Sequence, residues 1–307
     1  LISLNKLTQF NPDLEVENLF GLIGGIVYDS LIQSDGKIVI VGNITSYAGL
    51  PVNNIVRINT DGTKDDTFNV FTNGTVLCVA LANTRFYFGG DFTEFNGYPS
   101  NRIAATSSSG SINLSFRNNT MSFTSNPGAN GSVACITPDA SGNNIYVGGY
   151  FSRFNSNSSL RQAFVRIDSS GNVSTSTVGQ VISPSGTTPY VNTIHRQSDN
   201  KIILGGNISA YIPLGAFSPT TTGTGLVRIN TDFSGDNTFF INSVLTPNTG
   251  FNGAVKRVIS DASYVYAVGD FTTLNGSTAK SIVRLDKTTG SLSTNYGGGA
   301  VGGINDI

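Results

Sequence analysis

Residues 86–97 read Phe86-Tyr87-Phe88-Gly89-Gly90-Asp91-Phe92-Thr93-Glu94-Phe95-Asn96-Gly97, and this stretch recurs along the chain. Close copies occupy residues 145–155 and 265–276, and weaker copies occupy residues 38–45 and 202–209. When the copies are aligned, their second glycine positions are 42, 90, 149, 206 and 269. Repetition at intervals of roughly 50–60 residues predicts an architecture built from stacked units.

Each repeat contains four segments with strand character. A first segment with the pattern Val-x-x-(Val/Ile), as in residues 76–79, is followed by a turn rich in Asp, Asn and Gly. The second segment is apolar throughout, which predicts a strand buried on both faces, and it ends in Gly-Gly. We expect glycine there either because a side chain would block a neighbouring backbone or because φ must be positive. The six structural glycines expected on this basis are Gly89, Gly90, Gly148, Gly149, Gly205 and Gly206.

The third segment carries an arginine on an otherwise apolar strand, at Arg57, Arg166, Arg228 and Arg284. A buried guanidinium must be paired or hydrogen-bonded, so these arginines predict structural contacts between units, either to carbonyl groups or to residues such as Asp91. In the second repeat, Ala104 is expected at the arginine position. The fourth segment closes on an aromatic residue, namely Phe68, Phe116, Phe239 or Tyr296.

Four short strands in a meander cannot bury both faces alone, but units arranged radially can, and this arrangement removes exposed sheet edges. The sequence therefore predicts an all-β fold, a β-propeller of four-stranded antiparallel blades. It predicts one domain over residues 1–307, with whole repeats at 26–74, 75–130, 131–189, 190–251 and 252–297. Partial repeats at 1–25 and 298–307 favour a fragment of a longer propeller; closure with an incomplete sixth blade is the alternative.

The repeat resembles the delta-60, or propeller-like, repeats of bacterial and phage surface proteins. The family's repeat also runs Gly-Gly-Asp-Phe-Thr, then Asn-Gly, then Arg-Leu-Asn, then Asp-Gly and Phe. The resemblance covers nearly the whole chain. It implies the propeller fold and implies no particular activity.

Composition excludes several classes of function. Charged residues make up 12% of the chain and the net charge is −1, so no basic surface for nucleic acid is expected. No apolar run reaches the roughly 18 residues of a membrane span. Two cysteines and one histidine leave little scope for a zinc site, and no cofactor is expected.

The longest insertion, residues 211–225, is the candidate binding loop, with Tyr211 and Phe217 as its contact residues. Long loops on rigid scaffolds often carry binding functions, and we expect this one to protrude from the rim or one face. The alternative is a tolerated surface insertion.

Other polar motifs have structural explanations. Residues 59–66 resemble a calcium loop, but only the glycine recurs in the other repeats, which favours a turn. Asp91 and Asp270 alternate with Asn in other repeats, which favours side chains that cap their own turns. His195 lacks a nucleophile elbow and is interpreted as a strand-end residue. No catalytic residue is predicted.

Cys78 and Cys135 occupy the same position in the first strands of consecutive repeats. Equivalent positions on neighbouring blades point in parallel, and stacked sheets lie about 10 Å apart. A disulfide needs convergent Cβ atoms and a shorter separation. We therefore expect two buried, unbonded thiols.

These features favour a non-enzymatic structural and adhesive module of a bacteriophage virion, in its tail, fibre or capsid decoration. Expected partners are other structural subunits, with a host-surface glycan or protein as a further candidate. A secreted bacterial cell-surface binding protein is the first alternative. A propeller enzyme with a pocket at the channel mouth is the second.

Overall fold

The computed structural model describes residues 9–10, 16–17, 21–117, 128–155, 162–174, 179–216, 221–222, 224–239 and 250–293. Their regular structure is β-strand apart from one short 3-10 helix, η1 (Leu114–Arg117), which confirms the prediction of an all-β chain. Within those residues, no helix has the length and apolar character that crossing a membrane requires.

Five antiparallel sheets repeat the same order, with the second strand of each repeat in the middle. We call these sheets blades 1 to 5. Blade 1 contains β3 (Ile23–Ile32), β4 (Ile38–Tyr47) and β6 (Ile55–Ile58), with the short β5 (Leu50–Pro51) beside β4. Blade 2 contains β7 (Val76–Ala82), β8 (Arg85–Gly90) and β11 (Ile103–Ser107); blade 3 contains β12 (Val133–Pro138), β13 (Asn144–Gly149) and β14 (Phe164–Asp168). Blade 4 contains β16 (Tyr190–Arg196), β17 (Ile202–Asn207) and β20 (Leu226–Ile229); blade 5 contains β21 (Val255–Ser260), β22 (Tyr264–Gly269) and β25 (Ile282–Asp286).

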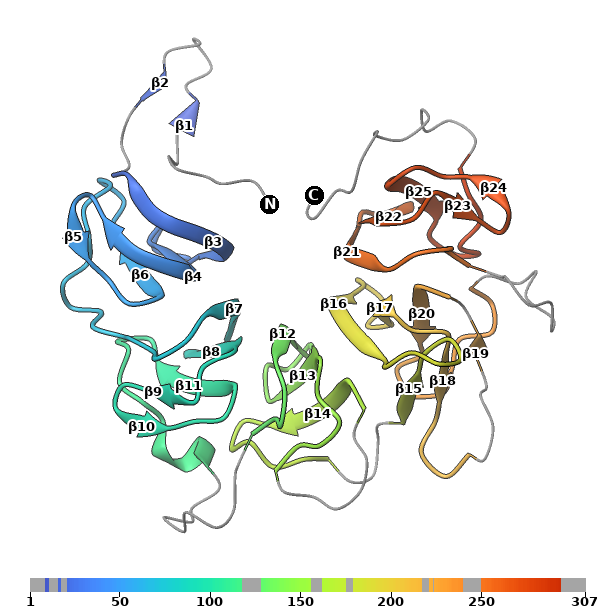
Figure 1. Ribbon diagram of the computed structural model, residues 1–307, viewed down its shortest axis with the longest axis horizontal. Helices are drawn as coiled ribbons and strands as arrows, with labels where there is room; N and C mark the ends of the chain where they lie inside the picture. The colour runs from blue at the N-terminus through green and yellow to red at the C-terminus, as the bar shows by residue number, and fades with distance from the viewer. Residues whose placement is uncertain are drawn as a thin grey trace.

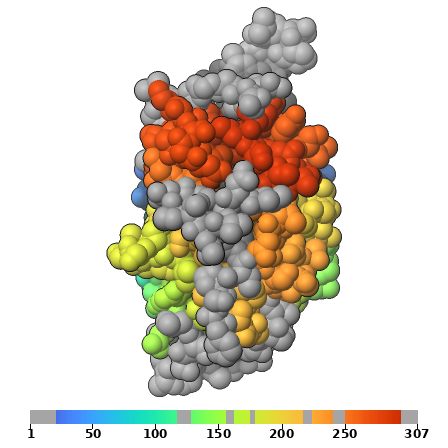
Figure 2. All heavy atoms as spheres, turned by 90° about the vertical axis from the view of Figure 1, so that its right-hand side faces the viewer, coloured from blue at the N-terminus to red at the C-terminus, as the bar shows by residue number. Residues whose placement is uncertain are grey.

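The blades are arranged around a common centre (Figure 1), and the first strand of each one, β3, β7, β12, β16 or β21, lies innermost. First strands of consecutive blades contact one another. Seen from the edge in Figure 2, blade 5 lies above blade 4 along the rim of the disc. The radial order follows the order of the repeats in the sequence.

The fourth strand of each repeat is shorter than the sequence predicts, because among the described residues it is reduced to a single bridge. The five bridges join Ile58 to Lys64, Thr106 to Ile112, Ile167 to Val173, Ile229 to Gly235, and Leu285 to Leu292. In blade 1 the chain turns away directly after this bridge, because the Asp65 carboxylate accepts a hydrogen bond from Thr67 N and the Phe68 amide bonds to Asp65 O. The turn buries Phe68, so the closing aromatic belongs to the core rather than to the sheet.

Smaller sheets extend the outer parts of the disc. The hairpins β9–β10 and β23–β24 follow the second strands of blades 2 and 5, and a three-stranded sheet of β15, β18 and β19 flanks blade 4. Near the start of the chain, β1 pairs with β2. Their bounds are β1 (Gln9–Phe10), β2 (Val16–Glu17), β9 (Glu94–Phe95), β10 (Tyr98–Pro99), β15 (Gln180–Ile182), β18 (Ala210–Ile212), β19 (Thr221–Thr222), β23 (Thr273–Leu274) and β24 (Ser277–Thr278).

The core lies between blades rather than within any single sheet. One cluster joins Val39 and Val41 of blade 1 to Phe86 and Phe88 of blade 2. Every residue from Phe86 to Gly90 is buried, which confirms that the second strand is covered on both faces. Neighbouring blades therefore supply each other's hydrophobic cover.

The paired glycines are required by close approach, since none of the six has a positive φ. The first strand contains a bulge, as between Val76 and Cys78, and the Thr75 carbonyl oxygen lies where a Cβ on Gly90 would be. Gly149 and Gly206 face the carbonyls of Ser132 and Tyr190 in the same way. The first glycine of each pair leaves room for the valine that opens the next blade, namely Val133 beside Gly89, Val191 beside Gly148 and Val255 beside Gly205.

Candidate functional site

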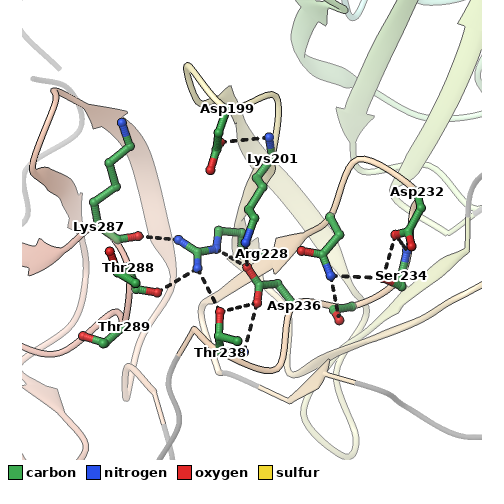
Figure 3. Close-up of polar contacts among 12 residues, drawn as sticks. Asp199, Lys201, Arg228, Asp232, Ser234, Asp236, Thr238, Lys287, Thr288 and Thr289 are labelled. Carbon is green, nitrogen blue, oxygen red and sulfur yellow. Dashed lines mark hydrogen bonds and ion pairs between the residues drawn. The ribbon is translucent and has the colours of Figure 1, made fainter.

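Two of the four arginines predicted to join consecutive blades, Arg57 and Arg228, do so through hydrogen bonds, whereas Arg284 makes contacts within its own blade. In blade 4, Arg228 lies on β20 and donates through Nη1 to the Lys287 carbonyl and through Nη2 to the Thr288 carbonyl (2.8 Å), both in the turn after β25 of blade 5 (Figure 3). In blade 1, Arg57 Nη1 donates to the Ser108 carbonyl of blade 2 at 2.6 Å. The acceptors are carbonyl groups of the next blade, and Asp91 is not among the acceptors that these two arginines use.

A shared carboxylate holds each of these two guanidinium groups. Asp236 Oδ2 lies 2.7 Å from Arg228 Nε and 2.8 Å from Lys201 Nζ, while Asp236 Oδ1 accepts from the amide and hydroxyl of Thr238. Burial alone would raise the pKa of Asp236, but the hydrogen bonds from Lys201 and Thr238 outweigh burial and hold that pKa well below its usual range. The carboxylate therefore stays charged between two cations.

Blade 1 repeats this arrangement with the same residue types. Asp65 Oδ2 lies 2.8 Å from Arg57 Nε and 2.7 Å from Lys37 Nζ, and Oδ1 binds Thr67. The Arg57 guanidinium lies over the Phe68 ring at 4.3 Å, and Arg228 lies over Phe239 at 4.2 Å. The sequence signal for these groups is Asp-x-Thr-Phe, eight residues after the arginine, with a lysine just before the second strand. In the sequence this signal is hidden, because Asp65 falls within the turn predicted for residues 59–66.

Blade 2 makes the inter-blade contact with a different arginine. The strand register places Ala105 opposite Tyr87, where blade 1 has Arg57 opposite Val39. Ala105, not Ala104, therefore occupies the arginine position, and the expected alignment was wrong by one residue. Arg85 at the start of β8 instead donates through Nη1 to the Ser169 carbonyl of blade 3 at 3.0 Å.

The two remaining arginines use weaker or local contacts. Arg166 of blade 3 lies 5.3 Å from the Phe233 ring of blade 4, and its Nη2 is 3.7 Å from Asp139. Arg284 of blade 5 donates through Nε and Nη2 to Ser293 and lies over Tyr264 in its own blade. The junctions from blade 1 to blade 5 are thus bridged in turn by Arg57, Arg85, Arg166 and Arg228.

A ring of equivalent side chains surrounds the centre, one from each first strand just after its bulge. The members are Asp29, Cys78, Cys135, Thr193 and Arg257. Most bind the backbone of the next blade: Val79 N donates to Asp29 at 3.0 Å, Cys135 Sγ lies 3.7 Å from Val191 O, and Val258 N donates weakly to Thr193. Arg257 of blade 5 lies 4.0 Å from Asp29 of blade 1, which links the first and last described blades.

Cys78 and Cys135 are both free and buried, which confirms the prediction of unbonded thiols. Burial raises the pKa of Cys78 and raises that of Cys135 to about 12. Thiols held in the protonated form are poor nucleophiles and poor metal ligands, so these residues act as small core side chains.

A polar cavity of about 520 Å³ lies beside the ends of β7 and β16 and the turn between β12 and β13. Its walls come from blades 2, 3 and 4, and include Asn83, Thr137, Asp139, Ser141, His195 and Arg196. His195, from β16, shares a 2.7 Å hydrogen bond with the Ser260 hydroxyl of blade 5. Burial, with help from the charges of Lys287, Arg196 and Arg257, lowers the pKa of His195, so the ring is neutral at pH 7.

The opposite end of the strands carries an aromatic pair, of which Tyr150 is exposed and Tyr190 is half-buried. Tyr150, which is 51% exposed, stacks on Tyr190 with ring centroids 4.6 Å apart. Its hydroxyl donates to Asn192 Oδ1 at 2.9 Å, and Asn192 Nδ2 donates to the Val255 carbonyl of blade 5. Burial, together with Tyr190, raises the pKa of Tyr150 to about 12. The pair is thus fixed in position and presents ring surface to solvent.

The structure corrects the expectation for Tyr211. Tyr211 is fully buried in β18, accepts a hydrogen bond from Gly179 N and donates one to Phe233 O, both at 3.0 Å. Tyr47 of blade 1 binds Gly21 N and Gly62 O in the same way, so Tyr211 is a structural residue and not a surface contact. Residues 210–212 and 221–222 pair as strands, whereas Phe217 lies outside the described residues.

The remaining motifs have local roles. Asp61 Oδ1 accepts from Thr63 N at 2.9 Å, which confirms the turn interpretation of residues 59–66. The capping interpretation of Asp91 and Asp270 is wrong, because Asp91 accepts from the Ser132 hydroxyl of blade 3 and Asp270 from Lys256. In the described part of the chain, no group of three His, Cys, Asp or Glu side chains could hold a metal ion.

Comparison with known families agrees with the radial sheets. Residues 33–68 and 143–176 match the family described as "Domain of unknown function (DUF5122) beta-propeller". This match and the radial sheets support a β-propeller fold. No curated protein matches it.

Several solved structures share a general similarity with the chain. A structure of the dihydro-heme d1 dehydrogenase NirN in complex with DHE is 14% identical, with a TM-score of 0.46, over 93% of this chain and 51% of that one. A chain of a mitotic checkpoint complex is 13% identical, with a TM-score of 0.47, over 94% of this chain and 69% of that one. The tricorn protease is 12% identical, with a TM-score of 0.44, over 88% of this chain and 22% of that one.

Proposed function

We propose that the chain is a non-enzymatic structural and adhesive module, built from five whole repeats of the delta-60 type, on the surface of a bacteriophage virion. Its partners would be other subunits of the particle and a glycan or protein of the host surface. The observation that carries this proposal is the Tyr150–Tyr190 pair, in which Tyr150 is exposed, held by Asn192 on a scaffold whose blades are bridged by arginines. A rigid aromatic surface with amide groups beside it suits contact with sugars or polar protein surfaces.

A non-enzymatic role fits the surroundings of His195. The His195–Ser260 pair resembles two members of a nucleophilic triad. However, within the described residues no carboxylate forms a hydrogen bond with the imidazole. The orienting acid of such a triad is therefore not found among the described residues.

The test is binding of the purified chain to cells or isolated cell envelopes of the host. Tyr150→Ala should weaken binding about tenfold, because it removes the exposed ring. Tyr98→Ala, which changes another tyrosine that is 42% exposed, is the matched control and should bind as the parent does. Equal binding by both variants would contradict a contact through Tyr150, and immunogold labelling that finds the chain on secreting bacteria rather than on particles would favour the cell-surface alternative.

A further inference from the structure

Two cations beside the cavity donate no hydrogen bond to a carboxylate of the described residues. Arg196 donates through Nε to the Pro138 carbonyl at 3.2 Å and through Nη1 to the Asn200 side chain at 2.9 Å. Lys287 donates to the Ser198 hydroxyl at 3.1 Å and to the Asp261 carbonyl at 2.9 Å. By contrast, Lys201 and Arg228 share the carboxylate of Asp236. Arg196 therefore has only neutral hydrogen-bond acceptors in the described part of the chain, whereas Lys287 also lies near the Asp261 carboxylate, whose pKa it helps to lower.

The carboxylate in the cavity wall, Asp139, is already occupied. Asp139 Oδ1 accepts from the amide and hydroxyl of Ser141, and Oδ2 accepts from Asn144 at 2.7 Å and lies 3.7 Å from Arg166. These contacts lower the pKa of Asp139 against the effect of its burial. Its oxygens thus stabilise the turn that forms one wall, and they leave the Arg196 charge available to a ligand.

The cavity wall also carries polar groups that have no hydrogen-bond partner in the described part of the chain. Arg196 Nη2 makes no hydrogen bond to the described part of the chain, and neither does the Asn83 amide group, which lies on the opposite wall. His195 uses only Nε2, in its bond to Ser260, so its Nδ1 faces no described partner. Small apolar groups, Ala82, Pro138 and Ala140, lie between these polar groups.

We propose that this cavity binds a monosaccharide that carries one carboxylate. The Arg196 guanidinium pairs with the carboxylate, Lys287 adds long-range attraction, and Asn83 and His195 meet ring hydroxyls. The apolar groups accommodate the C–H face of the sugar. A cavity of about 520 Å³ is within the range of small-ligand sites and holds one or two sugar units.

A carboxylate fits this wall better than a phosphate does. A phosphate dianion requires several cations or a row of backbone N–H groups, and only one guanidinium lines the cavity. A single planar fork matches a single carboxylate. This inference is independent of the adhesive surface, because Tyr150 lies at the opposite end of β13 from the cavity turn.

The experiment is isothermal titration calorimetry of the whole chain with sodium glucuronate, and with glucose, acetate and inorganic phosphate as comparison ligands. We expect saturable binding of glucuronate in the millimolar range or tighter, and at least about tenfold weaker binding of the other three. Equal affinity for acetate would overturn the sugar part of the proposal, equal affinity for phosphate would overturn the preference for a carboxylate, and equal affinity for glucose would overturn the role of charge.

Variants locate the site. Arg196→Gln should weaken glucuronate binding about tenfold or more, whereas Lys64→Gln, which removes a charge paired with Asp66 in blade 1, should leave it unchanged. Asn83→Asp places a negative charge on the opposite wall without changing side-chain size, so it should also weaken glucuronate binding. This second variant keeps the proposal testable if Arg196→Gln does not fold. Parent-like binding in both Arg196→Gln and Asn83→Asp, or no saturable binding by the parent, would overturn the proposal.

Discussion

Blade 1 and blade 2 meet the next blade by different means. In blade 1, Arg57 comes from the third strand, lies over Phe68 and reaches the Ser108 carbonyl. In blade 2, Tyr87 from the second strand packs against Phe116 at 5.6 Å, in the place that the guanidinium takes in blade 1, and Arg85 reaches the Ser169 carbonyl. The difference shows that the contact between blades is retained while the residue that makes it changes.

The largest expected effect comes from removing the ring that replaces the guanidinium in blade 2. Tyr87 is fully buried against Phe116, so Tyr87→Ala should lower the free energy of unfolding by about 3–5 kcal/mol. Tyr98→Ala, at an exposed tyrosine of the same blade, should change it by less than about 0.5 kcal/mol. Urea unfolding followed by circular dichroism measures both, and similar values for the two variants would contradict the packing described for blade 2.

Removing an arginine that joins two blades from a third strand should have the next largest effect on the free energy of unfolding. Arg228→Ala removes two carbonyl contacts to blade 5 and leaves Asp236 buried with Lys201 as its remaining cation. We expect a loss of about 3 kcal/mol in the same unfolding experiment. Lys201→Ala, which leaves the Arg228 contacts intact, should be less destabilising. The reverse order would mean that the carboxylate, and not the contact between blades, determines stability.

The carboxylates of Asp65 and Asp236 make the stability of the junctions held by Arg57 and Arg228 sensitive to acid. Both have pKa values lower in the folded chain than in the unfolded chain, so the unfolded chain binds more protons as the pH falls. These carboxylates contribute on the order of 2 kcal/mol to the free energy of unfolding above about pH 4, and this contribution is lost below that pH. Asp236→Asn should reduce this loss when unfolding is measured from pH 6 to pH 2. An unchanged pH dependence in that variant would show that Asp236 is not responsible.

Arg85→Ala should have the smallest effect of the series. Arg85 is only partly buried, forms no ion pair with a carboxylate of the described residues and donates one hydrogen bond to Ser169, so the expected loss in the free energy of unfolding is about 1 kcal/mol. Lys64→Ala, a charge change in an exposed ion pair, is the control and should be close to neutral. A loss as large as that of Arg228→Ala would contradict this order and would mean that Arg85 stabilises its junction as strongly as the third-strand arginines do.

The repeat pattern was sufficient to predict the radial fold, because the buried second strand and the Gly-Gly pair recur and report the close packing of neighbouring strands and blades. It was also sufficient to predict free thiols at Cys78 and Cys135. It could not place Tyr211, since the sequence of an insertion does not reveal that its tyrosine returns to the core as Tyr47 does. It also missed Arg85, because an exchange between two strands is visible only once the register puts Ala105 opposite Tyr87.

The sequence predicted a pocket only as one alternative, at the channel mouth of a propeller enzyme, and named no residues for it. Its walls come from turns 50 or more residues apart in the sequence, such as those of Asn83, Ser141 and Arg196, and no motif links them. What identifies it is the balance of charge, since Arg196 binds only neutral acceptors among the described residues. That property depends on distances that the sequence alone does not contain.

The central claim is that one arginine joins each of blades 1 to 4 to the turn of the next blade, whichever strand supplies it. The most direct test is a crystal structure of the chain, in which the distance from Arg85 Nη1 to the Ser169 carbonyl oxygen is measured. The account predicts a hydrogen bond near 3.0 Å across the junction of blades 2 and 3. An Arg85 guanidinium that lies in solvent, with no arginine bridging that junction, would contradict it.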